Sequence, residues 1–183
     1  MGETTRFMIR PVQMNDLAFL WDMLFEAAAV DAGMRSLGKE KALSLPVNRK
    51  YVEGWGRPGD AGVIALDGAE LPLGTAWYRL YPTEAPGYGF LSPTIPELTI
   101  GVCADVRNRG IGSALLQALI VLARSQGYAA LSLSVDRNNP ALHLYEDFGF
   151  YDAGVARQED TSVTMIKPLD NEPTWRGFQI YAR

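Results

Sequence analysis

The chain has 183 residues, 48% of them hydrophobic and 21% charged, which is an ordinary composition for one globular domain. Its single cysteine excludes an internal disulfide and agrees with a cytoplasmic location, and the lone histidine beside it argues against a metal site. A net charge of −4 argues against nucleic acid as the partner, and no apolar run suits a membrane span or a signal peptide.

The first sixty residues are expected to hold one strand and three helices. In chain order these are a strand over 6–11, a helix from residue 16 onward, and shorter helices around 39–43 and 49–55. Asn15 or Asp16 is the expected cap of the first helix. One face of that helix carries the apolar residues Leu17, Leu20, Trp21, Leu24, Phe25 and Ala28.

Strands follow in the middle of the chain. Those over 62–66 and 73–81 are joined at Asp67-Gly68, a dipeptide typical of hairpin turns. A proline-rich loop over 82–96 comes next, and a strand over 97–103 follows it.

A short basic glycine turn is the most informative stretch of the chain. It runs from Arg107 to Ser113 and begins a helix over 111–126, which Gly127 ends. The first turn of a helix offers unpaired N–H donors and the positive end of the helix dipole. The glycines let an anion approach the backbone, and the arginines add positive charge. The turn therefore predicts a site for a phosphate ester, in particular a pyrophosphate.

Two common phosphate-binding motifs do not fit this turn. A Walker loop needs a lysine after its second glycine, and no lysine follows Gly110 or Gly112. A dinucleotide fingerprint needs a third glycine where this chain has Leu115. The pattern that remains is Arg107-x-x-Gly110-x-Gly112.

A second block follows a predicted strand over 129–135. It reads Asn138-x-x-Ala141-x-x-x-Tyr145-x-x-x-Gly149-Phe150. Asn139 is the expected cap of a helix that begins at Pro140, and Gly149 suits the left-handed residue that ends it. A last strand is expected over 162–167.

In this order and spacing, the two blocks resemble the coenzyme A signature and the second signature block of the GNAT acetyltransferase superfamily. The resemblance is close over 97–169 and holds in outline before that. It implies a mixed α/β (α+β) domain over 1–169, with a mostly antiparallel, V-split central sheet flanked by helices. The apolar tail over 170–183 is expected to pack on the domain or at the subunit contact of a homodimer.

The resemblance also implies an activity: transfer of an acetyl group from acetyl-CoA, without a metal, to a primary amine. The acceptor would be a small molecule or a peptide, and it would attack directly in a ternary complex. The implied coenzyme contacts are backbone amides, a hydroxyl and basic or amide side chains, from Val102, Ala104, Arg107, Arg109, Gly110, Ile111, Gly112, Ser113 and Asn138. For Asn138 the alternative is an Asx turn before the helix.

Two residues are the implied catalytic groups. Tyr145 would protonate the leaving thiolate as general acid, although a plain core tyrosine would occupy the same helical stripe. Glu97 would take the amine proton directly or through water, unless it is a surface carboxylate at a strand edge. Strand alternation places Glu97 on the face of Thr99 and Gly101.

Other tempting residues have simpler interpretations. His143 is expected to be solvated, and Cys103 to be a small buried apolar residue without an activating base. The acceptor cleft is assigned by resemblance to 31–35, Tyr78 and the 82–96 loop. Two alternative functions stay open: a non-catalytic coenzyme A-binding sensor or interaction module, and a nucleotide-binding protein that uses the same glycine turn.

Overall fold

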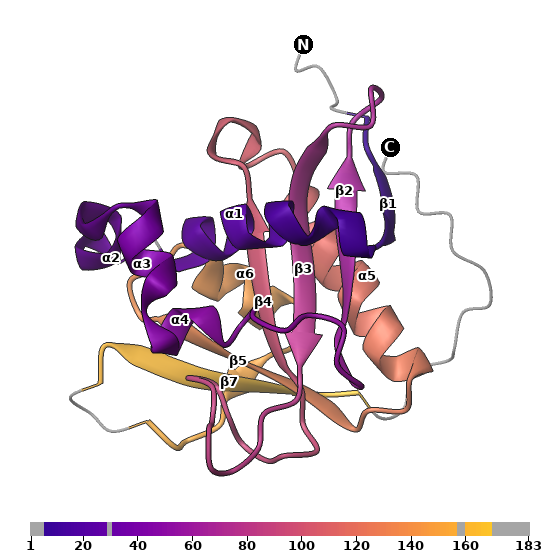
Figure 1. Ribbon diagram of the computed structural model, residues 1–183. Helices are drawn as coiled ribbons and strands as arrows, with labels where there is room; N and C mark the ends of the chain where they lie inside the picture. Colours follow the sequence, from indigo (N-terminus) through magenta and orange to yellow (C-terminus); the bar gives the residue numbers. More distant parts are fainter. Residues whose placement is uncertain (1–5, 29–30, 157–159, 170–183) are drawn as a thin grey trace.

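The computed structural model describes residues 6–28, 31–156 and 160–169, and they form one seven-stranded sheet with helices on both faces (Figure 1). The strand order is β1-β2-β3-β4-β5-β7-β6. The strands are β1 (Met8–Pro11), β2 (Ala61–Leu66), β3 (Pro72–Arg79), β4 (Glu97–Val102), β5 (Ala130–Asp136), β6 (Tyr151–Asp152) and β7 (Ser162–Pro168). The predicted tail over 170–183 lies outside the described residues.

The sheet divides between β4 and β5, its one parallel pair in the described chain. The two strands share a single register pair, Glu97 opposite Ser132, next to a hydrogen bond of 3.0 Å from the Ser132 N–H to the Pro96 carbonyl. Beyond that point they diverge, and Figure 1 shows β5 and β7 turning away from β3 and β4. This confirms the predicted V-split, mostly antiparallel sheet.

Two helical layers cover the sheet. One face carries α1 (Leu17–Ala28), α2 (Ala32–Leu37), α3 (Lys39–Ser44) and α4 (Pro46–Arg49), and the other carries α5 (Ile111–Ser125) and α6 (Ala141–Asp147). Short 3₁₀ turns cover Met14–Asp16 and Ala104–Val106. Alternation along β3 separates the two cores: Trp77 packs with Leu20 and Leu24 of α1, whereas Tyr78 packs with Leu119 of α5.

The start of the first helix differs from its prediction. A 3₁₀ turn precedes α1, and Gln13 is the capping residue. The Asp16 carboxylate accepts the Gln13 N–H at 2.7 Å and also binds Arg10 at 2.7 Å. Asp16 therefore lies inside the first turn, and neither Asn15 nor Asp16 is the cap. In this capping box, Gln13 and Asp16 each accept the backbone N–H of the other residue through their side chains. The cap therefore precedes the Asn and Asp that the sequence suggests.

The segment before β2 is more broken than its pattern predicts. The helix α2 was missed because none of its residues is buried, so it has no apolar periodicity. The expected helix over 49–55 was wrong, since α4 ends at Arg49 and turns follow it. Gly54 and Gly56 adopt φ values of 65° and 104°, which a continuing helix does not accept.

The β2–β3 connection is longer than the predicted two-residue turn. The Asp67 side chain accepts the N–H groups of Ala69 and Leu71 at 2.9 and 2.8 Å, and Glu70 adopts φ 63°. This side-chain-stabilised loop extends to Leu71. The two-residue strand β6 was not predicted, because it is too short for an alternating pattern. Elsewhere α5, β5, α6 and β7 lie within two residues of their predicted bounds.

Candidate active site

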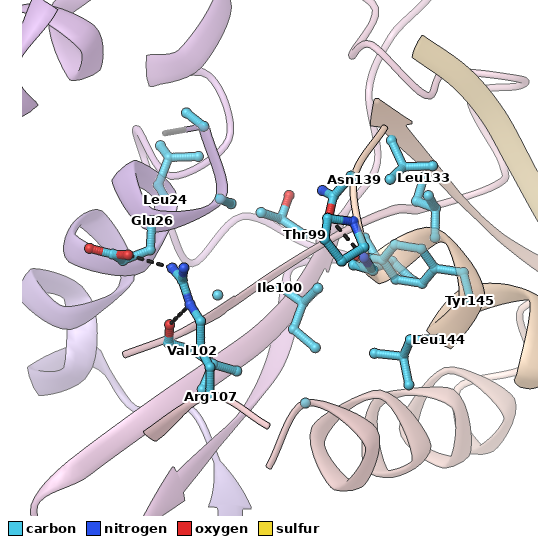
Figure 2. Close-up of a pocket in the computed structure, with 18 of the residues that line it drawn as sticks. Leu24, Glu26, Thr99, Ile100, Val102, Arg107, Leu133, Asn139, Leu144 and Tyr145 are labelled. Carbon is cyan, nitrogen blue, oxygen red and sulfur yellow. Dashed lines mark hydrogen bonds and ion pairs between the residues drawn. The ribbon is translucent and has the colours of Figure 1, made fainter. Parts of the chain in front are cut away.

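The divergence of β4 and β5 opens into a cavity of about 770 Å³ (Figure 2). Its walls come from α1, β4, the glycine turn, β5 and α6, together with Tyr51 and Tyr88. Figure 2 shows Arg107 and its partner Glu26 on one side of the cavity and Tyr145 on the opposite side, with Ile100 between them. Residues that are distant in sequence thus share one chamber.

The glycine turn presents backbone donors to this cavity. Gly110 is the left-handed residue at φ 80° that begins α5, and no side chain caps the helix there. Gly112 lines the cavity, and a Cβ built on it would lie 3.8 Å from its nearest neighbour, Leu144. A Cβ built on Gly110 would have no neighbour within 4 Å in the described structure, so open space adjoins amide groups that an α-helix leaves unpaired. These residues fit the pyrophosphate of coenzyme A.

The two arginines of the turn have different surroundings. Arg107 lines the cavity, pairs with Glu26 at 2.6 Å and donates from Nε to the Val102 carbonyl at 3.2 Å. Arg109 is exposed, outside the cavity lining, and donates to the Asp105 carbonyl at 3.2 Å. Of these two arginines, only Arg107 lines the cavity.

The open edge of β4 faces the gap in the sheet. The Cys103 N–H donates to the Leu73 carbonyl of β3 at 2.9 Å, whereas the Pro96 carbonyl accepts from Ser132 of β5. The backbone groups of odd-numbered residues therefore face β3, and those of even-numbered residues face β5. Ile100 and Val102 consequently direct their backbone groups toward the gap, where no ladder joins the two described strands. Ala104 is exposed in the following 3₁₀ turn and does not line the cavity. Its coenzyme contact stays a prediction.

Tyr145 satisfies both interpretations of its position. Its side chain is 6% exposed and packs against Phe150 with ring centroids 6.0 Å apart, as a core tyrosine would. It also lines the cavity (Figure 2). Burial raises the pKa of its hydroxyl, so Tyr145 keeps its proton until a strong base is near.

Asn138 and Asn139 differ in their placement. Asn138 is exposed and outside the cavity lining, and its N–H donates to the Asp136 side chain at 2.7 Å. The Asx turn is therefore made by Asp136. Asn139 lines the cavity, and its Oδ1 accepts the Ala141 N–H at 2.9 Å. The cap position of α6 is Pro140 and the helix begins at Ala141, one residue later than predicted.

Glu97 is a buried carboxylate and not a surface group, since only 3% of the residue is exposed. Its Oε1 accepts hydrogen bonds from the Tyr51 hydroxyl at 2.7 Å and the Gly89 N–H at 2.9 Å. Its Oε2 is buried without a hydrogen-bond partner in the described structure. Burial raises the pKa of Glu97, while the two donors and nearby Lys50 oppose that rise.

Other predicted residues take simpler places. His143 is exposed and bonds Glu146 at 3.1 Å, as expected of a solvated residue. Cys103 is half-buried, and burial raises the pKa of its thiol, which disfavours a thiolate nucleophile. Tyr78 lies on the α5 face and donates to Gln126 at 2.7 Å, so it does not line the cavity, contrary to the expectation.

No three metal-binding side chains gather anywhere in the described ranges, and none of their helices is long and apolar enough to cross a membrane.

Comparison with known proteins identifies the family. A model of the acetyltransferase (GNAT) family matches residues 21–150. The chain therefore belongs to the GNAT family. A relative from Pseudomonas paraeruginosa, L-methionine sulfoximine/L-methionine sulfone acetyltransferase, is 30% identical over 120 residues, which cover 65% of this chain and 67% of the relative.

Further GNAT relatives are larger proteins. The mycothiol acetyltransferase of Arthrobacter sp. is 34% identical over 111 residues, 58% of this chain but only 32% of that protein. The mycothiol acetyltransferase of Paenarthrobacter aurescens is 32% identical over 103 residues, 55% of this chain and 30% of that protein. The chain thus spans about a third of the length of these relatives.

Solved structures share the GNAT fold. The ribosomal-protein-alanine N-acetyltransferase of Brucella melitensis has a TM-score of 0.63 at 24% identity, covering 87% of this chain and 98% of that one. The PaiA N-acetyltransferase of Thermoplasma acidophilum, solved with coenzyme A, has a TM-score of 0.59 at 17% identity, covering 88% and 98%. At these identities the likeness establishes the fold alone.

Sequence reasoning missed three residues of the cavity wall. Tyr51, Asn48 and Glu26 all line it. Tyr51 lies in a stretch assigned to a helix, and Glu26 lies on the first helix, of which only the apolar face was singled out. No local pattern marks either residue, because each reaches the cavity through tertiary packing.

Proposed function

We propose that this GNAT domain, residues 1–169, transfers the acetyl group of acetyl-CoA to the primary amine of a small-molecule acceptor. The supporting observation is that one cavity joins the unpaired amides at the start of α5 to the buried carboxylate of Glu97. An anion site and a base in one chamber are what a ternary-complex transfer requires.

On the donor side, the amides of Gly110–Ser113 bind the pyrophosphate. Arg107 adds positive charge there, and Asn138 and Arg109 remain candidates at the outer edge. The pantetheine arm lies in the gap between β4 and β5, where the Val102 backbone faces it. A backbone N–H at this edge stabilises the negative charge that develops on the thioester oxygen.

The reaction forms one bond and breaks one. The amine nitrogen bonds to the thioester carbon, and the carbon–sulfur bond breaks to release the coenzyme thiolate. Glu97 receives the proton that the amine loses. Tyr145 gives its hydroxyl proton to the thiolate, which it can do despite its raised pKa because the cavity holds the two groups in contact.

The acceptor half suits a small polar amine. Glu97 supplies a carboxylate for an amine, and Arg35 adds a positive group at the cavity wall. The Pseudomonas relatives are named for acetylation of methionine sulfoximine and methionine sulfone, both amino-acid derivatives. Amino acids of this kind are therefore the first acceptors to test.

The test is thiol release from acetyl-CoA with methionine sulfoximine, methionine sulfone, other amino acids, polyamines and short peptides. At least one amine should accelerate release, and Tyr145→Phe should lower kcat by about 10²-fold or more while calorimetric affinity for acetyl-CoA is kept. Acetyl-CoA binding without release for any amine would favour the non-catalytic sensor. Binding of ATP or NAD alone would favour the nucleotide-binding alternative.

A further inference from the structure

The Tyr51 hydroxyl joins the Glu97 carboxylate to the loop before β4. It lies 2.7 Å from Glu97 Oε1 and 2.7 Å from the Tyr88 N–H. Tyr51 is only 7% exposed, so water does not compete for these bonds. The arrangement connects residues 46 positions apart in the chain.

The hydrogen positions in this group follow from its donors. The Tyr88 N–H can only donate, so it occupies a lone pair of the Tyr51 oxygen, and the single hydroxyl hydrogen of Tyr51 donates to Oε1. The Gly89 N–H donates to the same oxygen at 2.9 Å. Since Oε1 accepts twice, any proton on Glu97 resides on Oε2.

Glycine is required where the loop meets the carboxylate. A Cβ built on Gly87 would lie 1.9 Å from Glu97 Oε2, and one built on Gly89 would lie 2.4 Å from the Leu133 carbonyl carbon of β5. The loop backbone therefore covers Oε2 directly. The Tyr88 ring stacks on the Tyr51 ring, with centroids 6.4 Å apart and an interplanar angle of 14°, and this contact also holds the loop segment in place.

We propose that Tyr51 is a positioning residue for the Glu97 base: its hydroxyl keeps the buried carboxylate in its proton-accepting form and holds the segment Gly87–Gly89 over it. The inference rests on the proposed function in that it takes Glu97 as the base. The Tyr51 and Gly89 donors favour the ionised form of the carboxyl, whereas burial favours the protonated form. Gly87 packs against Oε2, the oxygen that has no hydrogen-bond donor in the described structure.

Few other ionisable groups face this carboxylate. Lys50 approaches it from the segment after α4, where its ammonium also lies 5.7 Å from the Tyr88 ring centroid. Tyr81, from the segment after β3, lies against the Tyr51 ring at 5.5 Å, and its hydroxyl has no hydrogen-bond partner in the described structure. Arg79 pairs with Glu97 in the strand register, but its guanidinium is bound to Asp60.

Tyr51→Phe tests the proposal, and Tyr81→Phe is its matched control, because it deletes a neighbouring buried hydroxyl that makes no hydrogen bond. Three measurements apply: titration of the Glu97 carboxyl by ¹³C NMR, hydrogen exchange of the Tyr88 amide, and the pH profile of kcat. In Tyr51→Phe the carboxyl should titrate at higher pH and the Tyr88 amide should exchange faster. Below the titration midpoint kcat should fall about tenfold, as for loss of one hydrogen bond to a charge, and it should approach wild type at high pH.

These readouts separate the proposal from the proposed function. An unchanged Glu97 titration and Tyr88 exchange in Tyr51→Phe would overturn the positioning role, even in an active enzyme. A shifted Glu97 titration in a protein that acetylates no amine would support the positioning role of Tyr51 and contradict the proposed acetyltransferase function. A uniform fall in kcat at all pH values, with the titration unmoved, would also overturn the proposal.

A second variant guards against misfolding of the first. Gly87→Ala places a methyl group against Oε2, whereas Gly68→Ala places one in open space in the β2–β3 loop. The first should move the Glu97 titration and lower kcat, and the second should change neither. Equal behaviour of the two alanine variants would contradict the close approach of the loop to the carboxylate.

Discussion

Neutralising Asp60 should destabilise this protein far more than an ordinary surface substitution. The Asp60 and Arg79 side chains are 2% and 0% exposed and are joined by two hydrogen bonds of 2.9 and 2.7 Å. Arg79 also donates to the carbonyls of Lys50 and Glu53 at 2.7 and 3.0 Å. The pair thus organises the segment that carries Tyr51.

The magnitude follows from the burial of the pair. Asp60→Asn keeps the shape of the side chain but leaves the Arg79 charge in the protein interior without a counter-charge. Breaking a fully buried ion pair by removing one partner costs about 3–5 kcal/mol. For a domain of this size each kcal/mol corresponds to about 2–4 °C in Tm. Urea denaturation and thermal melting measure both quantities.

Asp22→Asn is the control, because it breaks an ion pair with Lys39 whose side chains are 47% and 51% exposed. Exposed pairs contribute about 0–1 kcal/mol. A loss in Asp60→Asn no larger than in Asp22→Asn would refute the claim that Arg79 depends on its buried partner. Since the pair supports the Tyr51 segment, Asp60→Asn should also lower kcat.

Three further variants have distinct expected outcomes. Because burial raises the pKa of Glu97, the folded protein keeps that proton to higher pH than the unfolded chain. The free energy of unfolding of the wild type should therefore fall, relative to that of Glu97→Gln, as pH rises from the ordinary glutamate range through the raised pKa. A constant difference between the two proteins in urea denaturation at every pH would contradict this. Arg107→Ala should leave the free energy of unfolding within about 1 kcal/mol, since its pair with Glu26 is partly exposed, but should weaken acetyl-CoA binding and flatten its salt dependence in calorimetry; unchanged binding would remove Arg107 from the site. Cys103→Ala should retain full thiol-release activity, and its inactivation would reopen a covalent route.

The second half of the fold could be predicted because its information is local. Gly110 before α5, and Gly127 and Gly149 after helix C-termini, all adopt φ near 80°. At the two C-termini, residue type alone anticipates this left-handed conformation. The helix between the first two has an apolar face long enough to show its period. The resemblance of the two sequence blocks to the GNAT superfamily then implied a split sheet beside the glycine turn.

The part of the cavity around Tyr51 and Glu97 could not be predicted in the same way. The bond between Tyr51 and Glu97 joins residues far apart in the chain, and it depends on how the segment after α4 packs under the loop. The short helix α2 has no buried face, and Asp16 in the 3₁₀ turn before α1 pairs with Arg10 of β1. Such features arise from tertiary contacts, which leave no periodic trace in the sequence.

Amide chemical-shift mapping of the ¹⁵N-labelled chain with added coenzyme A tests most directly whether the divergence of β4 and β5 is the coenzyme site. The account predicts the largest shifts at Ile100 and Val102 on the open strand edge and at Ile111, Gly112 and Ser113 at the start of α5. Unchanged resonances at these amides, with shifts confined to β6 and the outer edge of β7, would contradict it.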